Sequence, residues 1–211
     1  AFYRQQRGRQ APMLPLDLLA IPLFSLSILT SICAYAAQIL AYVALPFLFQ
    51  AIMHYSTVMT GLLVTPWPLF VAFAAPLAGK LAARYPAALL SSVGLAILAF
   101  GLLMLSIMPS APAMPDIIWR MALCGIGFGF YQTPNNLTVM TSGPSTRSGA
   151  ASGMLAVART TGWSVGSALV ALIFGLAGGS HGATARLELG VGFAVCCAFL
   201  GVILRVVRHG S

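Results

Sequence analysis

Six long apolar runs, separated by short segments that hold most of the charges and turn-forming residues, dominate this 211-residue chain. Hydrophobic residues make up 59% of the sequence and charged residues only 7%, whereas soluble domains average about 25% charged residues. A helix needs ~20 apolar residues to cross a bilayer. The sequence therefore predicts an all-α membrane protein with six transmembrane helices, over residues 20–49, 57–79, 87–108, 116–140, 149–177 and 186–207. The longest runs exceed a perpendicular crossing, which predicts tilt or a kink near Pro46.

The net charge of +8 comes from Lys and Arg residues that are scattered between the apolar runs. Because they form no basic face, nucleic acid is not an expected partner. Cytoplasmic loops are enriched in Lys and Arg, and eight of these residues belong to the two ends and alternate separators: Arg4, Arg7, Arg9, Lys80, Arg84, Arg147, Arg205 and Arg208. The pattern predicts that both termini are cytoplasmic, with a lead-in segment over residues 1–19 and a tail over 208–211.

Cysteine and histidine positions argue against a metal site and against an enzyme. The four cysteines lie inside apolar runs without metal-ligand spacing. The three histidines, His54, His181 and His209, lie at the edges of the runs, so no base accompanies a nucleophile such as Ser152 at membrane depth. We expect no cofactor, no metal and no enzymatic activity.

Arg159 is the most informative single residue. It lies about twelve residues into an uncharged run, ~18 Å along a helix from Arg147, which places it near the middle of a ~30 Å hydrocarbon layer. A charge at that depth faces a bundle interior or a water-filled cavity and marks an ion or substrate path. Trp163 follows one turn later on the same side.

The acidic residues, Asp17, Asp116 and Glu188, all lie at predicted membrane boundaries. The partner of Arg159 is therefore water, a backbone carbonyl, a polar side chain such as Gln38, a substrate, or a carboxylate on another polypeptide. A carboxylate-based proton relay would likewise need an acid from outside this chain.

Other polar groups fall at helical spacing. Tyr35, Gln38 and Tyr42 share one helix face, and the Gln38 amide must pair across helices or face a cavity. Arg120 follows Asp116 by one turn, which suits an ion pair or an interfacial position.

Later in the same run, Pro134 frees a backbone carbonyl. Asn135 and Asn136 could bond that carbonyl or contact a solute. Glycines four residues apart predict close helix packing, at Gly125 and Gly129, at Gly149 and Gly153, and at Gly162 and Gly166.

Two stretches carry a family resemblance: residues 120–136, with Pro-Asn-Asn at 134–136, and residues 147–159, which begin Arg-Ser-Gly-Ala-Ala-Ser-Gly-Met. Together with Pro-Leu-Asp-Leu-Leu at 15–19, they resemble the C-terminal half of the fourteen-helix drug:proton antiporters of the major facilitator superfamily. The segment 79–86 is similar to the superfamily's cytoplasmic loop motif at Gly79, Leu81 and Arg84, but Ala83 replaces its acid and Pro86 its second glycine.

This resemblance implies two inverted three-helix repeats, 20–108 and 116–207, in a bacterial inner membrane. The partner would be the N-terminal half of the same transporter, the energy source the proton gradient, and the substrates lipophilic compounds, typically cations. The implied cavity residues are Tyr35, Gln38, Tyr42, Trp67, Tyr131, Asn135, Asn136, Arg159 and Trp163. The implied structural or gating residues are Gly79, Arg84, Arg120, Gly125, Gly129, Gly149, Gly153, Gly162 and Gly166. Trp67 could instead anchor the membrane interface. The alternative is a self-contained six-helix carrier or channel that acts as a homo-oligomer with a second copy of this domain.

Overall fold

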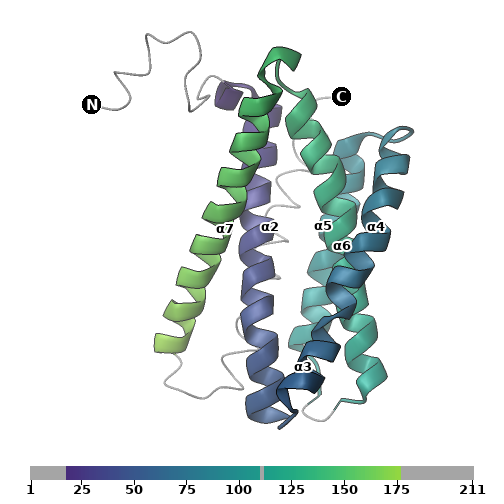
Figure 1. Ribbon diagram of the computed structural model, residues 1–211, viewed down its shortest axis with the longest axis vertical. Helices are drawn as coiled ribbons and strands as arrows, with labels where there is room; N and C mark the ends of the chain where they lie inside the picture. Colours follow the sequence, from purple (N-terminus) through teal and green to yellow (C-terminus); the bar gives the residue numbers. More distant parts are fainter. Residues whose placement is uncertain (1–17, 110–111, 177–211) are drawn as a thin grey trace.

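The computed structural model describes residues 18–109 and 112–176, and this part of the chain is helical (Figure 1). The elements are, in order, η1 (Leu18–Ala20), α2 (Pro22–Phe47), η2 (Leu48–Ile52), α3 (Thr57–Val64), α4 (Pro66–Ala82), α5 (Ala87–Ser106), α6 (Met114–Thr141), η3 (Ser145–Arg147) and α7 (Ser148–Leu176). The helix predicted over 186–207, the tail 208–211 and nearly all of the lead-in 1–19 lie outside the described residues. The arrangement in two repeats stays a prediction.

Within the described ranges, four segments are long and apolar enough to cross a membrane: Pro22–Ile52, Thr57–Ala82, Ala87–Ser106 and Ser148–Ile173. They match four of the predicted spans to within a few residues. Figure 1 shows these helices running along the long axis of the molecule.

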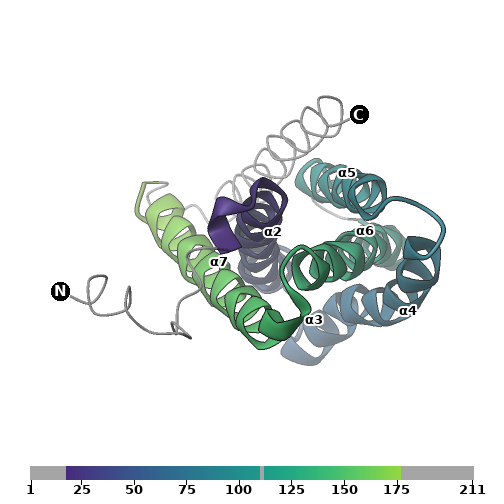
Figure 2. The ribbon, with the colours of Figure 1, turned by 90° about the horizontal axis from the view of Figure 1, so that it is seen from above.

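Helix α6 is 28 residues long but less apolar than the other spans, because it carries Asp116, Arg120 and several polar residues near its end. It nevertheless forms the centre of the described bundle, packing against α5 and α4 and also contacting α2, α3 and α7 (Figure 2). A helix that is covered on most sides needs few lipid-facing side chains. The polar content of α6 therefore reflects its central position.

Prolines interrupt two of the predicted helices. Pro46 lies in the last turn of α2, and the chain continues as a π-helical turn, η2, which is the irregularity expected near this residue. The span predicted as one helix over 57–79 is divided, since α3 ends at Val64 and α4 begins at Pro66 and ends at Ala82. Pro66 and Pro68 have no N–H to donate to the preceding turn, so the hydrogen-bond ladder breaks there.

Glycines set how closely the helices approach. A Cβ on Gly125 would collide with the carbonyl oxygen of Trp67, and a Cβ on Gly129 would lie 2.8 Å from the Cβ of Ala74. This pair of glycines therefore lets α6 pack directly against α4. Gly162 approaches the carbonyl of Ile32 on α2 in the same way. The close packing predicted from the glycine spacing is therefore present at these positions.

The first glycine pair of α7 is different. A Cβ on Gly149 or Gly153 would have no atom within 4 Å among the described residues, and both glycines are exposed. Gly166 meets Ala36 and Ile39 on α2, so only the later half of the predicted seam packs within the described bundle.

We predict that Gly125→Ala lowers the unfolding free energy by about 1–3 kcal/mol, because its methyl group cannot fit without separating α6 from α4. Thermal unfolding of the purified chain in detergent would measure the change. The control is Gly61→Ala in α3, which meets open space and should be neutral or stabilising by up to about 1 kcal/mol. Equal effects of the two substitutions would contradict the packing role.

Candidate functional site

A cavity of about 230 Å³ opens between α2, α4, α6 and α7. The cavity residues expected from the sequence belong to these same four helices. Complete small-molecule sites measure ~300–1,000 Å³, so this volume suits one wall of a larger site. Its lining residues are Tyr35, Gln38, Tyr42, Pro68, Val71, Phe128, Gln132, Arg159 and Trp163.

Tyr35 joins three of the helices at this cavity. Its ring makes edge-on contacts with Phe128 of α6 and Trp163 of α7, with centroid distances of 5.7 Å and 6.2 Å. Its phenol oxygen accepts a hydrogen bond from Nε2 of Gln132 at 2.7 Å. Because the ring is 5% exposed and held from three sides, the cavity wall around it is pre-organised.

Arg159 lies at the same place on α7. Its guanidinium carbon is 5.4 Å from the centroid of the Tyr35 ring, a cation–π distance, and the side chain is exposed. The structure thus gives a partner for Arg159 that the sequence did not suggest. Trp163, 42% exposed, adds an accessible aromatic surface one turn away.

Sequence spacing therefore identified five of the lining residues: Tyr35, Gln38, Tyr42, Arg159 and Trp163. It missed Pro68, Val71, Phe128 and Gln132. Phe128 and Gln132 are one helical turn apart on α6, and an amide in an apolar run was a signal that could have been used for Gln132, as it was for Gln38.

Two expected aromatic residues do not line this cavity. Trp67 is fully buried behind Tyr42, with 5.1 Å between their ring centroids, and its indole N–H has no hydrogen-bond partner among the described residues. This burial places it in the helix interface between α2, α4 and α6. Tyr131 is also buried, where its backbone adjoins Gly94 of α5.

The two asparagines also lie elsewhere. Asn135 donates hydrogen bonds from Nδ2 to Ser31 Oγ at 2.8 Å and to the Ser27 carbonyl at 3.4 Å, and it accepts one from Thr30 Oγ1 at 3.5 Å. It therefore connects α6 to α2 and does not face the cavity. Asn136 is partly buried and does not line the cavity.

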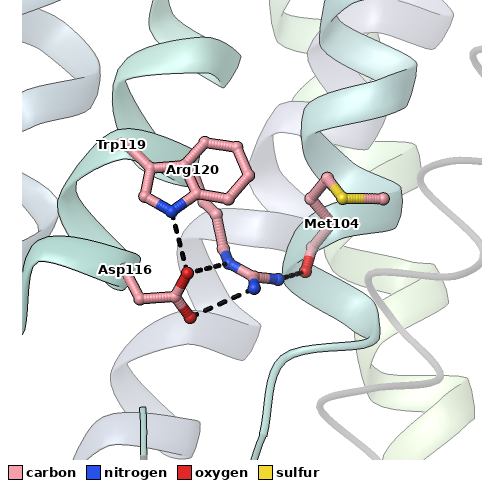
Figure 3. A network of polar contacts seen from close by, with 4 residues as sticks. All are labelled: Met104, Asp116, Trp119 and Arg120. Atoms are coloured by element: carbon pink, nitrogen blue, oxygen red, sulfur yellow. Dashed lines mark hydrogen bonds and ion pairs between the residues drawn. The ribbon is translucent and has the colours of Figure 1, made fainter. Parts of the chain in front are cut away.

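Arg120 has a complete set of partners away from the cavity (Figure 3). It pairs with both carboxylate oxygens of Asp116, at 3.1 Å each, so the ion pair predicted from their spacing is present. It also donates to the Met104 carbonyl and lies 5.1 Å from the centroid of the Trp119 ring. Trp119 in turn donates to Asp116 at 2.8 Å. This network ties the start of α6 to the end of α5.

The segment 79–86 that resembles the cytoplasmic motif covers the last turn of α4 and the loop to α5, and both Gly79, in α4, and Arg84, in the loop, are exposed. A Cβ on Gly79 would lie 3.7 Å from a methyl group of Thr133, an ordinary contact. The gating role of this loop stays a prediction.

Comparison with known proteins places the chain in a family. Residues 3–167 match the family model "Major Facilitator Superfamily", and the chain belongs to this family of membrane transporters. It is 54% identical over 182 residues to the "Uncharacterized transporter YebQ" of Escherichia coli, a match that covers 85% of this chain and 40% of that protein.

Two further relatives have names that state a function. The chain is 32% identical over 166 residues to the "Multidrug resistance protein Stp" of Mycobacterium tuberculosis, covering 78% of this chain and 30% of Stp. It is 29% identical over 173 residues to the "Multidrug efflux pump LfrA" of Mycolicibacterium smegmatis, covering 82% of this chain and 34% of LfrA. The chain thus spans 40% or less of the length of these relatives.

We predict that Asn135→Ala destabilises the chain by about 1–2 kcal/mol, because it removes the hydrogen bonds between α6 and α2. Unfolding in detergent would measure the loss. Asn136→Ala, in the next position, should change stability by less than about 0.5 kcal/mol. A larger loss for Asn136→Ala than for Asn135→Ala would mean that the contacts of Asn135 do not connect the helices.

Proposed function

We propose that this chain is the C-terminal six-helix domain of a proton-coupled multidrug efflux transporter that exports lipophilic compounds. The observation that carries the proposal is the cavity between α2, α4, α6 and α7, which is lined by aromatic rings and by the guanidinium of Arg159. Membership of the Major Facilitator Superfamily and similarity to Stp and LfrA support it. A transporter of this superfamily holds its substrate near the bilayer midplane between two six-helix halves.

The remaining parts of the proposal concern the whole transporter. Its N-terminal half would supply the other wall of the cavity, and the proton gradient would drive export. Both termini of this domain would be cytoplasmic, in a bacterial inner membrane. We expect no enzymatic step, no bound cofactor and no nucleic-acid partner.

The walls suit lipophilic substrates, with cations as the first class to test. The exposed ring of Trp163 and the half-buried ring of Tyr42, which line the same cavity, offer apolar area together with a π-surface that attracts cations. The guanidinium of Arg159 repels a cationic substrate in the same cavity unless a negative charge lies beside the guanidinium.

The direct test is uptake of the fluorescent cation ethidium into inverted membrane vesicles in response to a proton gradient. We expect uptake with the full-length product of the gene and none with this 211-residue chain alone, because a proton-carrying carboxylate would come from the other half. Gradient-driven uptake by the chain alone would instead favour a homo-oligomeric carrier. If neither the full-length product nor the 211-residue chain takes up ethidium, the proposed export of ethidium-like cations is wrong.

Substitution of an aromatic residue in the cavity should show whether that residue contacts the substrate or only stabilises the fold. We predict that Trp163→Ala in the complete transporter lowers efflux about tenfold, since one aromatic contact contributes ~0.5–1.5 kcal/mol beyond the apolar area that it buries. The matched control is Phe73→Ala on α4, which removes an aromatic ring that is 70% exposed and lies outside the cavity. Efflux rates at equal membrane levels would measure both. Equal losses would argue against a substrate contact at Trp163.

A further inference from the structure

Two arginines lie in long helices of the described bundle, Arg120 in α6 and Arg159 in the candidate membrane span α7, and their surroundings differ sharply. Arg120, 11% exposed at its side chain, is paired with the Asp116 carboxylate, the Met104 carbonyl and the Trp119 ring. Arg159 is exposed, and its contact among the described residues is the face of the Tyr35 ring. The Tyr35 ring offers no acceptor for the five N–H groups of a guanidinium.

The depth of Arg159 makes this difference significant. It is the twelfth residue of α7, about 17 Å along the helix from Ser148. Charged side chains at such depth are paired or face a polar cavity. Asp116 is the one acidic residue within the described ranges, and it is bonded to Arg120 and Trp119 outside the cavity.

The neighbouring polar groups of the cavity also favour binding of a group that accepts hydrogen bonds. Tyr35 uses its oxygen to accept from Gln132, which leaves its own hydroxyl hydrogen to donate. The Gln38 amide lines the same cavity and can donate as well. The planar fork of a guanidinium matches a carboxylate with two parallel hydrogen bonds.

We infer that this cavity binds a carboxylate at Arg159, against the ring of Tyr35. The inference deepens the proposed function and rests on it, because it specifies the charge of the group that the substrate cavity accommodates. The carboxylate has two possible sources. An aromatic acid that is exported would bring its own carboxylate, whereas a cationic substrate requires that an acidic side chain from the rest of the transporter occupies this position.

The test uses the complete transporter in detergent and in vesicles, with two probes of equal shape, 2-naphthoate and 2-naphthamide. If the substrate supplies the carboxylate, the wild type binds naphthoate at least about tenfold more tightly than naphthamide. Arg159→Gln abolishes this preference, and Arg159→Lys, which keeps the charge but loses the fork, retains part of it. Lys80→Gln, which removes an exposed charge outside the cavity, leaves it unchanged.

If the transporter supplies the carboxylate, the wild type binds both probes equally. Ethidium transport in Arg159→Gln then shifts its pH midpoint upward by about one unit, because a nearby guanidinium lowers the pKa of an acid and its removal raises that pKa. Arg159→Lys shifts the midpoint less, and Lys80→Gln does not shift it.

Unchanged probe affinities together with an unchanged pH midpoint in Arg159→Gln would overturn the inference. A wild type that does not transport ethidium would count against the proposed function. The naphthyl probes then decide the inference by themselves: a naphthoate preference that depends on Arg159 supports it, and equal binding of the two probes overturns it. If Arg159→Gln does not reach the membrane, Arg159→Lys provides the comparison, with a smaller loss of the naphthoate preference or a smaller shift of the pH midpoint expected.

Discussion

Close backbone contact around α6 is the constraint on which the rest of the described bundle depends. In hydrocarbon, helices gain little from burying apolar surface against one another, so association relies on packing and on interhelical hydrogen bonds. Gly125 and Gly129 let α4 approach one side of α6, and Gly127 lets α5 approach another. The buried hydrogen bonds of Asn135 then connect α6 to α2. The cavity lies beside these contacts, between α2, α4, α6 and α7.

The two halves of α7 serve different purposes in this arrangement. Its later glycines, Gly162 and Gly166, bring it onto α2, and this contact places Arg159 and Trp163 beside Tyr35. Its first glycines meet open space within the described bundle. One stripe of α7, at positions 159, 162, 163 and 166, therefore combines the glycines that pack on α2 with the cation and the aromatic ring that line the cavity.

The candidate site could be predicted where residues of one helix share a face. Tyr35, Gln38 and Tyr42 repeat at helical spacing, and so do Arg159 and Trp163, and all five line the cavity. Trp67 and Asn135 could not be placed in this way. Whether each faces a cavity or a neighbouring helix depends on how α4 and α6 are rotated against α2, and residue spacing within one helix carries no information about that rotation.

Taken alone, the amino-acid sequence determined that the chain is helical with several long apolar segments, and about where most of the described helices begin and end. It also predicts a cation at mid-depth on α7. These properties follow from apolar length, proline positions and charge counts, which act locally along the chain. Only the tertiary structure decided that Arg120, besides its predicted pair with Asp116, donates to the Met104 carbonyl of α5, while Arg159 faces a cavity beside Tyr35. The reason is that a charge in a membrane is defined by its neighbours on other helices, and these are brought together only by packing.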